Sequence, residues 1–241
     1  MSKSIRRLAV IPARGNSKRI KNKNLKKFVD KPIINFTIEN AKKSNLFSTI
    51  HISTESEKIT KHISKLGFKP DFKRPKYLSK DNASIFSVVY YVYNQYFEKN
   101  ILFDEIWLLT ATSPLISYND LKNASIFFRE KKNSNPLISV SKFKAPIEWS
   151  FTMNKFNILK PINKKNLFKR SQNFSDKYFD TGSFAIFNPS NLRNSDGKFF
   201  KGKFCGYEID QFKAADIDNY QDWKYAEKLY KSINYFKQTA K

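Results

Sequence analysis

The chain has 241 residues, of which 40% are hydrophobic and 16% aromatic, and its 45 lysines and arginines against 21 aspartates and glutamates give a formal net charge of +24. This length and apolar content fit one well-buried α/β domain and argue against a disordered chain or two independent domains. The lysines are scattered through every segment instead of forming one basic tract, so the charge favours small anionic ligands and indicates no specific nucleic-acid motif.

The cysteine content and the N-terminal sequence indicate the cellular compartment in which the protein is expected to work. Cys205 is the single cysteine and can form neither an internal disulfide nor a zinc site, which fits a reducing compartment. The N-terminus has no apolar run of the kind that a signal peptide needs, and no stretch approaches the roughly 20 apolar residues of a membrane span. We expect a cytoplasmic protein without a membrane partner.

Strand and helix patterns alternate along the first half of the chain, which predicts a mainly parallel sheet covered by helices. The expected elements, in chain order, are strand 7–12, helix 32–43, strand 49–54, helix 57–66, strand 68–72, helix 83–97, strand 105–110, helix 117–131, strands 137–141, 184–187 and 204–209, and a last helix after residue 218.

Two local patterns refine this order. Asp218 and Gln221 have the spacing of a capping box, which predicts where the last helix begins. Between residues 142 and 173 the alternation breaks at Pro146 and Pro161, so the chain is expected to leave the main sheet there. We therefore expect a single domain over residues 1–241 with an inserted arm at about 142–173.

A basic loop follows the first strand. From Ala13 to Asn24 it holds one glycine and five cationic side chains. Backbone amides and cations at the carboxyl end of a strand make a receptor for a polyphosphate. The spacing is neither that of a P-loop nor that of a dinucleotide-binding turn. A solvated basic loop after an edge strand is the other interpretation.

The loop and three later motifs resemble the acylneuraminate cytidylyltransferase family, which activates nine-carbon acidic sugars with CTP. The matching residues are Ala13-Arg14-Gly15-x-Ser17-Lys18-x-Ile20 with Lys23-Asn24 and Lys31-Pro32, then Arg74-Pro75-x-x-Leu78-x-x-Asp81-x-Ala83-Ser84, Thr112-Ser113-Pro114-Leu115, and Asp216-x-Asp218. The resemblance implies a three-layer Rossmann-like nucleotidyltransferase fold and a homodimer in which the arm reaches the second subunit. It also implies transfer of CMP from CTP to the anomeric hydroxyl of a nonulosonic acid, with release of pyrophosphate.

The resemblance implies a nucleotide-binding set consisting of Ala13, Arg14, Gly15, Asn16, Ser17, Lys23, Arg74, Asp81 and Ser84. Arg14 and Lys23 are expected to be catalytic, because fixed cations stabilise the charge that builds on the transferring phosphoryl group. The other loop lysines, Lys18 among them, are interpreted as solvated surface charges. Asp81 can also cap the helix that is expected to start at residue 83.

Asp216 and Asp218 are the expected metal ligands, with Asp216 the third catalytic residue. Two carboxylates one residue apart, after a strand and before a helix, can hold Mg²⁺ together with phosphate oxygens. The alternative makes Asp218 a helix cap and Asp216 a surface residue. No general base is assigned.

The expected sugar-binding residues are Thr110, Thr112, Ser113, Arg170, Gln172, Asp180 and Gly182. The Arg170-Ser171-Gln172 run and the Asp-x-Gly at 180–182 are similar to the pseudaminic acid branch of the family. Arg170 can clamp a sugar carboxylate or, equally, serve a dimer contact. N-acetylneuraminic, legionaminic and 3-deoxy-manno-octulosonic acids are the alternative acceptors, and a basic nucleic-acid-binding protein is the remote alternative.

Overall fold

In the computed structural model, which describes residues 4–131, 135–195 and 202–239, six strands form a central sheet in the order β10-β6-β9-β5-β1-β4. The strands are β1 (Arg7–Pro12), β4 (Thr49–Ser53), β5 (Glu105–Leu109), β6 (Leu137–Lys142), β9 (Tyr178–Phe187) and β10 (Cys205–Glu208). β9 runs antiparallel to both of its neighbours, while the other five strands point the same way. The predicted mainly parallel sheet is confirmed.

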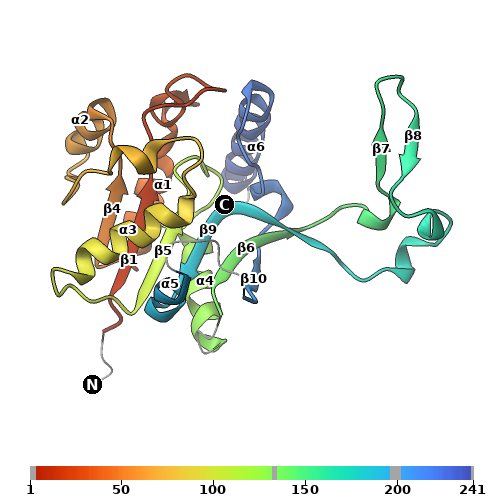
Figure 1. The fold of residues 1–241 in the computed structure, drawn as a ribbon. Coiled ribbons are helices and arrows are strands. Elements are labelled where there is room, and N and C mark those ends of the chain that lie inside the picture. Colours follow the sequence, from red (N-terminus) through yellow and green to blue (C-terminus); the bar gives the residue numbers. More distant parts are fainter. Residues whose placement is uncertain (1–3, 132–134, 196–201, 240–241) are drawn as a thin grey trace.

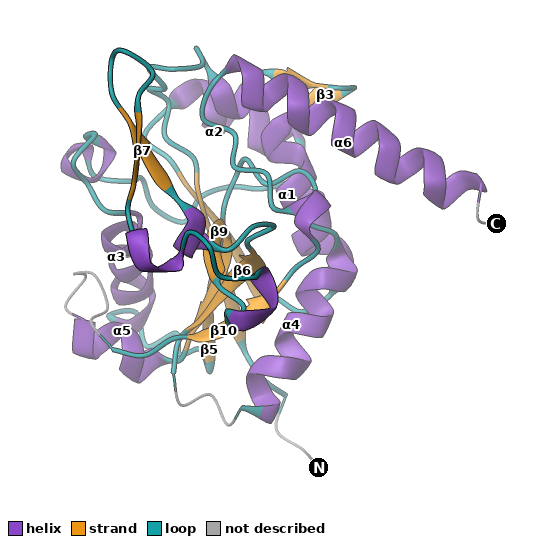
Figure 2. Cartoon of the chain, turned by 90° about the vertical axis from the view of Figure 1, so that its right-hand side faces the viewer, coloured by secondary structure: helices purple, strands orange, loops and turns teal. Residues whose placement is uncertain are grey.

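Helices cover both faces of this sheet. They are α1 (Ile33–Ser44), α2 (Glu57–Lys65), α3 (Ile85–Phe97), α4 (Tyr118–Glu130), α5 (Pro189–Ser195) and α6 (Tyr220–Thr239). One buried cluster joins the sheet to α1, α2 and α4, and another joins it to α3 and α5. Figure 2 views the sheet nearly edge-on, with α3 and α5 on one side and α1 and α4 on the other. The three-layer α/β arrangement is confirmed.

The side chains of β1 show how the sheet is covered by helices on both faces. Ala9 and Ile11 join the cluster under α1, and Leu8 and Val10 join the cluster under α3, all four fully buried. A strand covered on both faces has a continuous apolar run instead of alternation. β1 is therefore an interior strand, which contradicts the idea of a basic loop following an edge strand.

The expected strand at 68–72 is not formed. Phe68 packs against the core at the edge of the sheet, and Phe72 stacks on His51 with ring centroids 4.4 Å apart. These partly buried aromatic residues produced a strand-like pattern, but Pro70 between them has no amide hydrogen to donate to a ladder.

The last helix begins one residue later than the predicted capping box requires. Its first amides, those of Gln221 and Asp222, donate to the side chain of Asn219 at 2.8 and 3.0 Å. Asp218 does not cap the helix because its carboxylate accepts from Arg19 instead, at 2.7 Å. The aspartate is thereby kept beside the basic loop.

The segment between β6 and β9, residues 143–177, projects away from the sheet and is called the arm below (Figure 1). It carries the short antiparallel pair β7 (Phe151–Met153) and β8 (Leu159–Pro161). A second short pair, β2 (Lys27–Phe28) and β3 (Lys31–Pro32), follows the basic loop. β9 starts at Tyr178, earlier than the strand expected at 184, because its first residues pair with the end of β6 beyond a bulge. None of the helices in the described ranges has the length and apolar character that a bilayer crossing needs.

Candidate functional site

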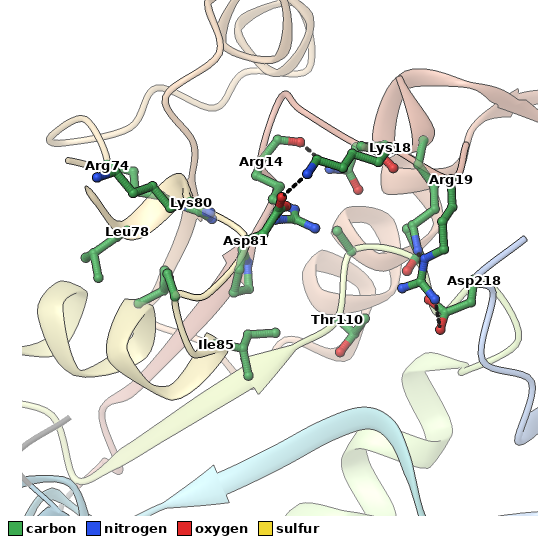
Figure 3. A pocket seen from close by; sticks show the side chains of 18 residues that line it. Arg14, Lys18, Arg19, Arg74, Leu78, Lys80, Asp81, Ile85, Thr110 and Asp218 are labelled. Atoms are coloured by element: carbon green, nitrogen blue, oxygen red, sulfur yellow. Dashed lines mark hydrogen bonds and ion pairs between the residues drawn. The ribbon is translucent and has the colours of Figure 1, made fainter. Parts of the chain in front are cut away.

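A cavity of about 480 Å³ opens where β1 and β5 end (Figure 3). Its lining consists of Pro12, Arg14, Ser17, Lys18, Arg19, Lys23, Asn24, Arg74, Leu78, Lys80, Asp81, Ala83, Ile85, Val88, Thr110, Ala111, Thr112 and Asp218. Ligands of open α/β sheets gather at the carboxyl ends of the strands, so the cavity lies where this fold binds them.

The lining is strongly cationic, with six basic side chains against two carboxylates. Four of the cations come from the loop after β1, and Arg74 and Lys80 come from the segment before α3. Like charges gathered in one cavity repel one another unless an anion joins them. The cavity is built for a multiply charged anion.

Asp81 faces the loop across this cavity. Its carboxylate accepts from Arg14 Nη1 at 2.8 Å and from Lys18 Nζ at 2.6 Å, and Figure 3 shows both side chains directed at it. Lys18, interpreted from sequence as a solvated lysine, therefore lines the cavity although its side chain is 73% exposed. The helix-cap role is taken by Ser84, whose hydroxyl accepts from the Phe86 amide at 3.2 Å.

Lys23 connects the basic loop to the acidic segment at 216–218. Its ammonium donates to the Ile217 carbonyl at 2.5 Å and lies 3.9 Å from the Asp218 carboxylate. Burial lowers the pKa of Lys23, and the charges of Asp218 and Asp216 oppose that shift. Lys23 is thus a partly buried cation held at the edge of the cavity.

Asp218 lines the cavity from the segment before α6, and Asp216, which is not in the lining, interacts electrostatically with Asp218 and Lys23. Burial, followed by the charge of Asp218, raises the pKa of Asp216. In the ranges that the structure describes, no three His, Cys, Asp or Glu side chains gather into a metal-holding group. Mg²⁺ usually takes one or two carboxylates and fills its remaining positions with water and phosphate oxygens. Two neighbouring carboxylates beside a cationic cavity fit that ion when a phosphate ligand supplies further oxygens.

Ala13, Gly15 and Asn16 do not line the main cavity. The Ala13 amide donates to the Ser53 carbonyl at 2.9 Å, and the Gly15 amide donates to Glu55 Oε1 at 2.7 Å. A Cβ on Gly15 would lie 2.6 Å from that of Ser56, so only glycine fits this close approach. Asn16 borders an adjoining hollow that includes Glu55. Here Ala13 and Gly15 shape the loop, and their amides do not point at a ligand.

Arg74 is a buried member of the lining. Its guanidinium donates to the Ser53 hydroxyl at 3.1 Å and to the Ser53 carbonyl at 2.6 Å. Burial lowers the pKa of Arg74 to about 10, partly offset by the charge of Glu55. Arg74 thereby ties the end of β4 to the cavity wall.

The expected sugar-binding residues separate into two groups. Thr110 and Thr112 line the cavity, and the Thr110 hydroxyl donates to the Gly182 carbonyl. Ser113 lies beside Thr110 in a small hollow, and the Asp180 carboxylate accepts from the Gly182 amide at 2.8 Å. These residues join the end of β5 to β9.

Arg170 and Gln172 lie on the arm, and neither is part of the main cavity's lining. Gln172 borders a second cavity of about 390 Å³ at the base of the arm.

Sequence reasoning assigned no binding or catalytic role to three polar residues of the cavity. Asn24 is buried, and its amide donates to the Arg14 carbonyl at 2.9 Å, which holds the loop. Its position directly after Lys23 in the quoted motif was a signal that pointed to it. Arg19 had a signal as part of the Ser17-Lys18-Arg19-Ile20 run, which is similar to the pseudaminic acid branch, whereas Lys80 had none beyond its charge. Only the fold brings both to the cavity.

A sequence model of the cytidylyltransferase family matches residues 8–240. The pseudaminic acid cytidylyltransferase of Campylobacter jejuni subsp. jejuni serotype O:2 is 34% identical over 94% of this chain and 97% of its own. A CMP-N,N'-diacetyllegionaminic acid synthase of the same organism is 32% identical over 92% of this chain and 94% of its own. A solved CMP:2-keto-3-deoxy-manno-octonic acid synthetase complexed with CTP has a TM-score of 0.70 at 15% identity, covering 94% of this chain and 99% of that one, which shows a shared fold.

Proposed function

Because the chain belongs to the cytidylyltransferase family, we propose that it transfers CMP from CTP to the anomeric hydroxyl of a nonulosonic acid and releases pyrophosphate. The observation that carries this proposal is the cavity with six basic side chains at the carboxyl ends of β1 and β5, next to the paired carboxylates of Asp216 and Asp218. A triphosphate supplies the negative charge that such a cavity lacks.

The proposed mechanism is an in-line attack of the sugar hydroxyl on the α-phosphorus of CTP. Arg14 and Lys23 hold the phosphate oxygens, and they stabilise the transition state because negative charge builds there as pyrophosphate departs. Lys23 suits this role because its ammonium is already partly desolvated and held by the Ile217 carbonyl. Cations that are fixed before the reaction need no reorganisation during it.

Asp216 and Asp218 are the proposed ligands of Mg²⁺. When bound, the ion would neutralise phosphate charge and lower the barrier to attack. The Asp218 carboxylate also holds Lys23 and Arg19 in place, since it contacts both cations. Arg14, Ser17, Lys23 and Arg74 remain the proposed nucleotide contacts, with Ala13, Gly15, Asn16 and Ser84 shaping their surroundings.

Pseudaminic acid is the proposed acceptor. The Campylobacter jejuni pseudaminic acid enzyme matches this chain almost end to end, and the Arg170-Ser171-Gln172 and Asp180-x-Gly182 patterns point to the same subclass. Thr110, Thr112 and Ser113 would line the sugar side of the cavity, and Asp180 and Gly182 would shape it from β9.

We also propose a homodimer of single-domain subunits joined by the arm. The arm exposes large apolar side chains, with Met153 64%, Ile158 63%, Ile162 67% and Phe168 97% exposed. Exposed apolar surface of this kind marks an interaction site. Because the arm projects away from the sheet and neither residue lines the cavity of its own subunit, Arg170 and Gln172 would meet the sugar in the partner's cavity, which reconciles their sugar-binding and dimer-contact interpretations.

The test is to mix the purified protein with CTP, Mg²⁺ and pseudaminic acid and to identify the products by mass spectrometry. Formation of the CMP-sugar supports the proposal, and omission of either substrate should abolish it. If CTP is consumed equally well without any sugar, or not at all with the four candidate acids, the proposed reaction is wrong.

A further inference from the structure

Asp81 is a carboxylate located where a polyphosphate is expected to bind. Asp81 forms ion pairs with both Arg14 and Lys18. Arg14 contacts one oxygen of the carboxylate and Lys18 contacts the other (Figure 3). Hydrogen bonding from Lys18, followed by the Lys18 charge, lowers the pKa of Asp81, so the carboxylate is ionised at neutral pH. Two of the cavity's six cations are therefore already paired with a carboxylate of the protein, whose single negative charge offsets one of their two positive charges.

Two opposite roles are compatible with this contact. A carboxylate can orient Arg14 and Lys18 for the ligand, in which case its removal weakens phosphate binding. Alternatively, it competes with the ligand's phosphate for the same donors, in which case its removal strengthens binding. The side chain of Asp81 lines the cavity and is 52% exposed, so water can solvate the carboxylate once a ligand has taken Arg14 and Lys18 from it. Exposed ion pairs of this kind are weak and exchange easily.

We propose that Asp81 is an internal counter-ion that a polyphosphate must displace, so that it weakens the binding of both CTP and pyrophosphate. The proposal rests on the proposed function, because it assumes that Arg14 and Lys18 hold phosphate oxygens. Its consequence is kinetic as well. After transfer, Asp81 reclaims Arg14 and Lys18 as pyrophosphate leaves, which speeds product release.

The experiment measures binding of inorganic pyrophosphate by titration calorimetry at low salt, without sugar, for the wild type and Asp81→Asn. The amide keeps the shape of the side chain but removes its charge. We expect Asp81→Asn to bind pyrophosphate about threefold to tenfold more tightly, because the two ion pairs that the phosphate must displace are exposed and therefore weak. The gain should shrink as salt is added.

Asp176→Asn is the matched control. Asp176 pairs with Lys142 at 2.6 Å and is 53% exposed, nearly the geometry of the Lys18–Asp81 pair, but it lies on the arm. It should leave pyrophosphate binding unchanged. A general change in the protein's field is excluded by repeating Asp81→Asn in a Lys18→Met background. Competition for Lys18 predicts a smaller gain there, whereas a field effect predicts the same gain.

An unchanged or weakened affinity in Asp81→Asn overturns the inference, and so does a gain that persists fully in the Lys18→Met background. These outcomes leave the proposed function standing, provided the wild type binds pyrophosphate and CTP. If the wild type binds neither, the proposed function fails and this inference fails with it.

Discussion

Replacing Gly15 with alanine tests whether the close approach of the basic loop to the turn after β4 determines activity. The added Cβ would lie 2.6 Å from Ser56 Cβ and 2.9 Å from Ser56 Oγ. Carbon atoms in contact are about 3.5–4.0 Å apart, so the loop must move by about 1 Å. Ser56 cannot yield easily, because its amide donates to Thr54 and its carbonyl accepts from Thr60 in the first turn of α2.

Two costs follow from that movement. The bond from the Gly15 amide to Glu55, at 2.7 Å, is strained or lost, which together with the overpacking should destabilise the fold by about 1–3 kcal/mol. Arg14 and Ser17 move with the loop, and a displacement of about 1 Å at a catalytic group costs about 100-fold in rate. We expect kcat/KM for CTP to fall by about that factor.

The assay is steady-state turnover of CTP together with thermal unfolding, and Ser56→Gly provides the rescue. The Ser56 side chain makes no capping bond to α2, so Ser56→Gly alone should cost only a few tenths of a kcal/mol. The double variant removes the Cβ that clashes and should regain most of the lost rate. Wild-type kcat/KM in Gly15→Ala, or a double variant no better than the single one, would refute the reasoning.

Three further predictions concern charged groups. Lys23→Met should lower kcat by about 100- to 1,000-fold, as loss of one transition-state donor does, while Lys21→Met, outside the cavity lining, stays near the wild-type rate. Asp216→Asn should abolish turnover yet raise the melting temperature of the metal-free protein at neutral pH: a raised carboxyl pKa means that folding disfavours the ionised form, and an amide removes that penalty. An equal or lower melting temperature would contradict this. His51 is buried with its pKa lowered to about 4, so folding favours its neutral form. Its contribution is complete above its unfolded pKa of about 6.5 and is lost as the pH falls toward 4. Urea unfolding at pH 7 and pH 5 should show a smaller pH effect in His51→Asn than in the wild type.

Local patterns predicted the fold well where a single element determines its own structure. A helix was expected over residues 117–131, and α4 forms there with Ser117 as its N-cap, in a capping box with Asp120. The continuous apolar sequences of β1 and β5 form interior strands of the sheet. The errors at 68–72 and at Asp218 arose where tertiary contacts override a local pattern, through aromatic packing in one case and an ion pair with Arg19 in the other.

The site was predictable only in part for the same reason. Lys23 and Arg74 belong to quoted motifs and line the cavity. Lys18 and Asp81 also belong to quoted motifs, but their pairing joins residues 63 positions apart in the chain, and neither motif by itself reveals that contact. The arm's orientation also cannot be read from its sequence, so only the fold shows that Arg170 and Gln172 do not line the main cavity of their own subunit.

The most direct test of the account is pyrophosphate release from CTP, measured with a panel of pseudaminic, legionaminic, N-acetylneuraminic and 3-deoxy-manno-octulosonic acids, with Mg²⁺ and with a chelator. The account predicts release with pseudaminic acid that depends on Mg²⁺. Release with another acid alone would keep the reaction and contradict the assignment of Arg170 to Gly182. No release with any acid would contradict the central claim that this cavity transfers CMP.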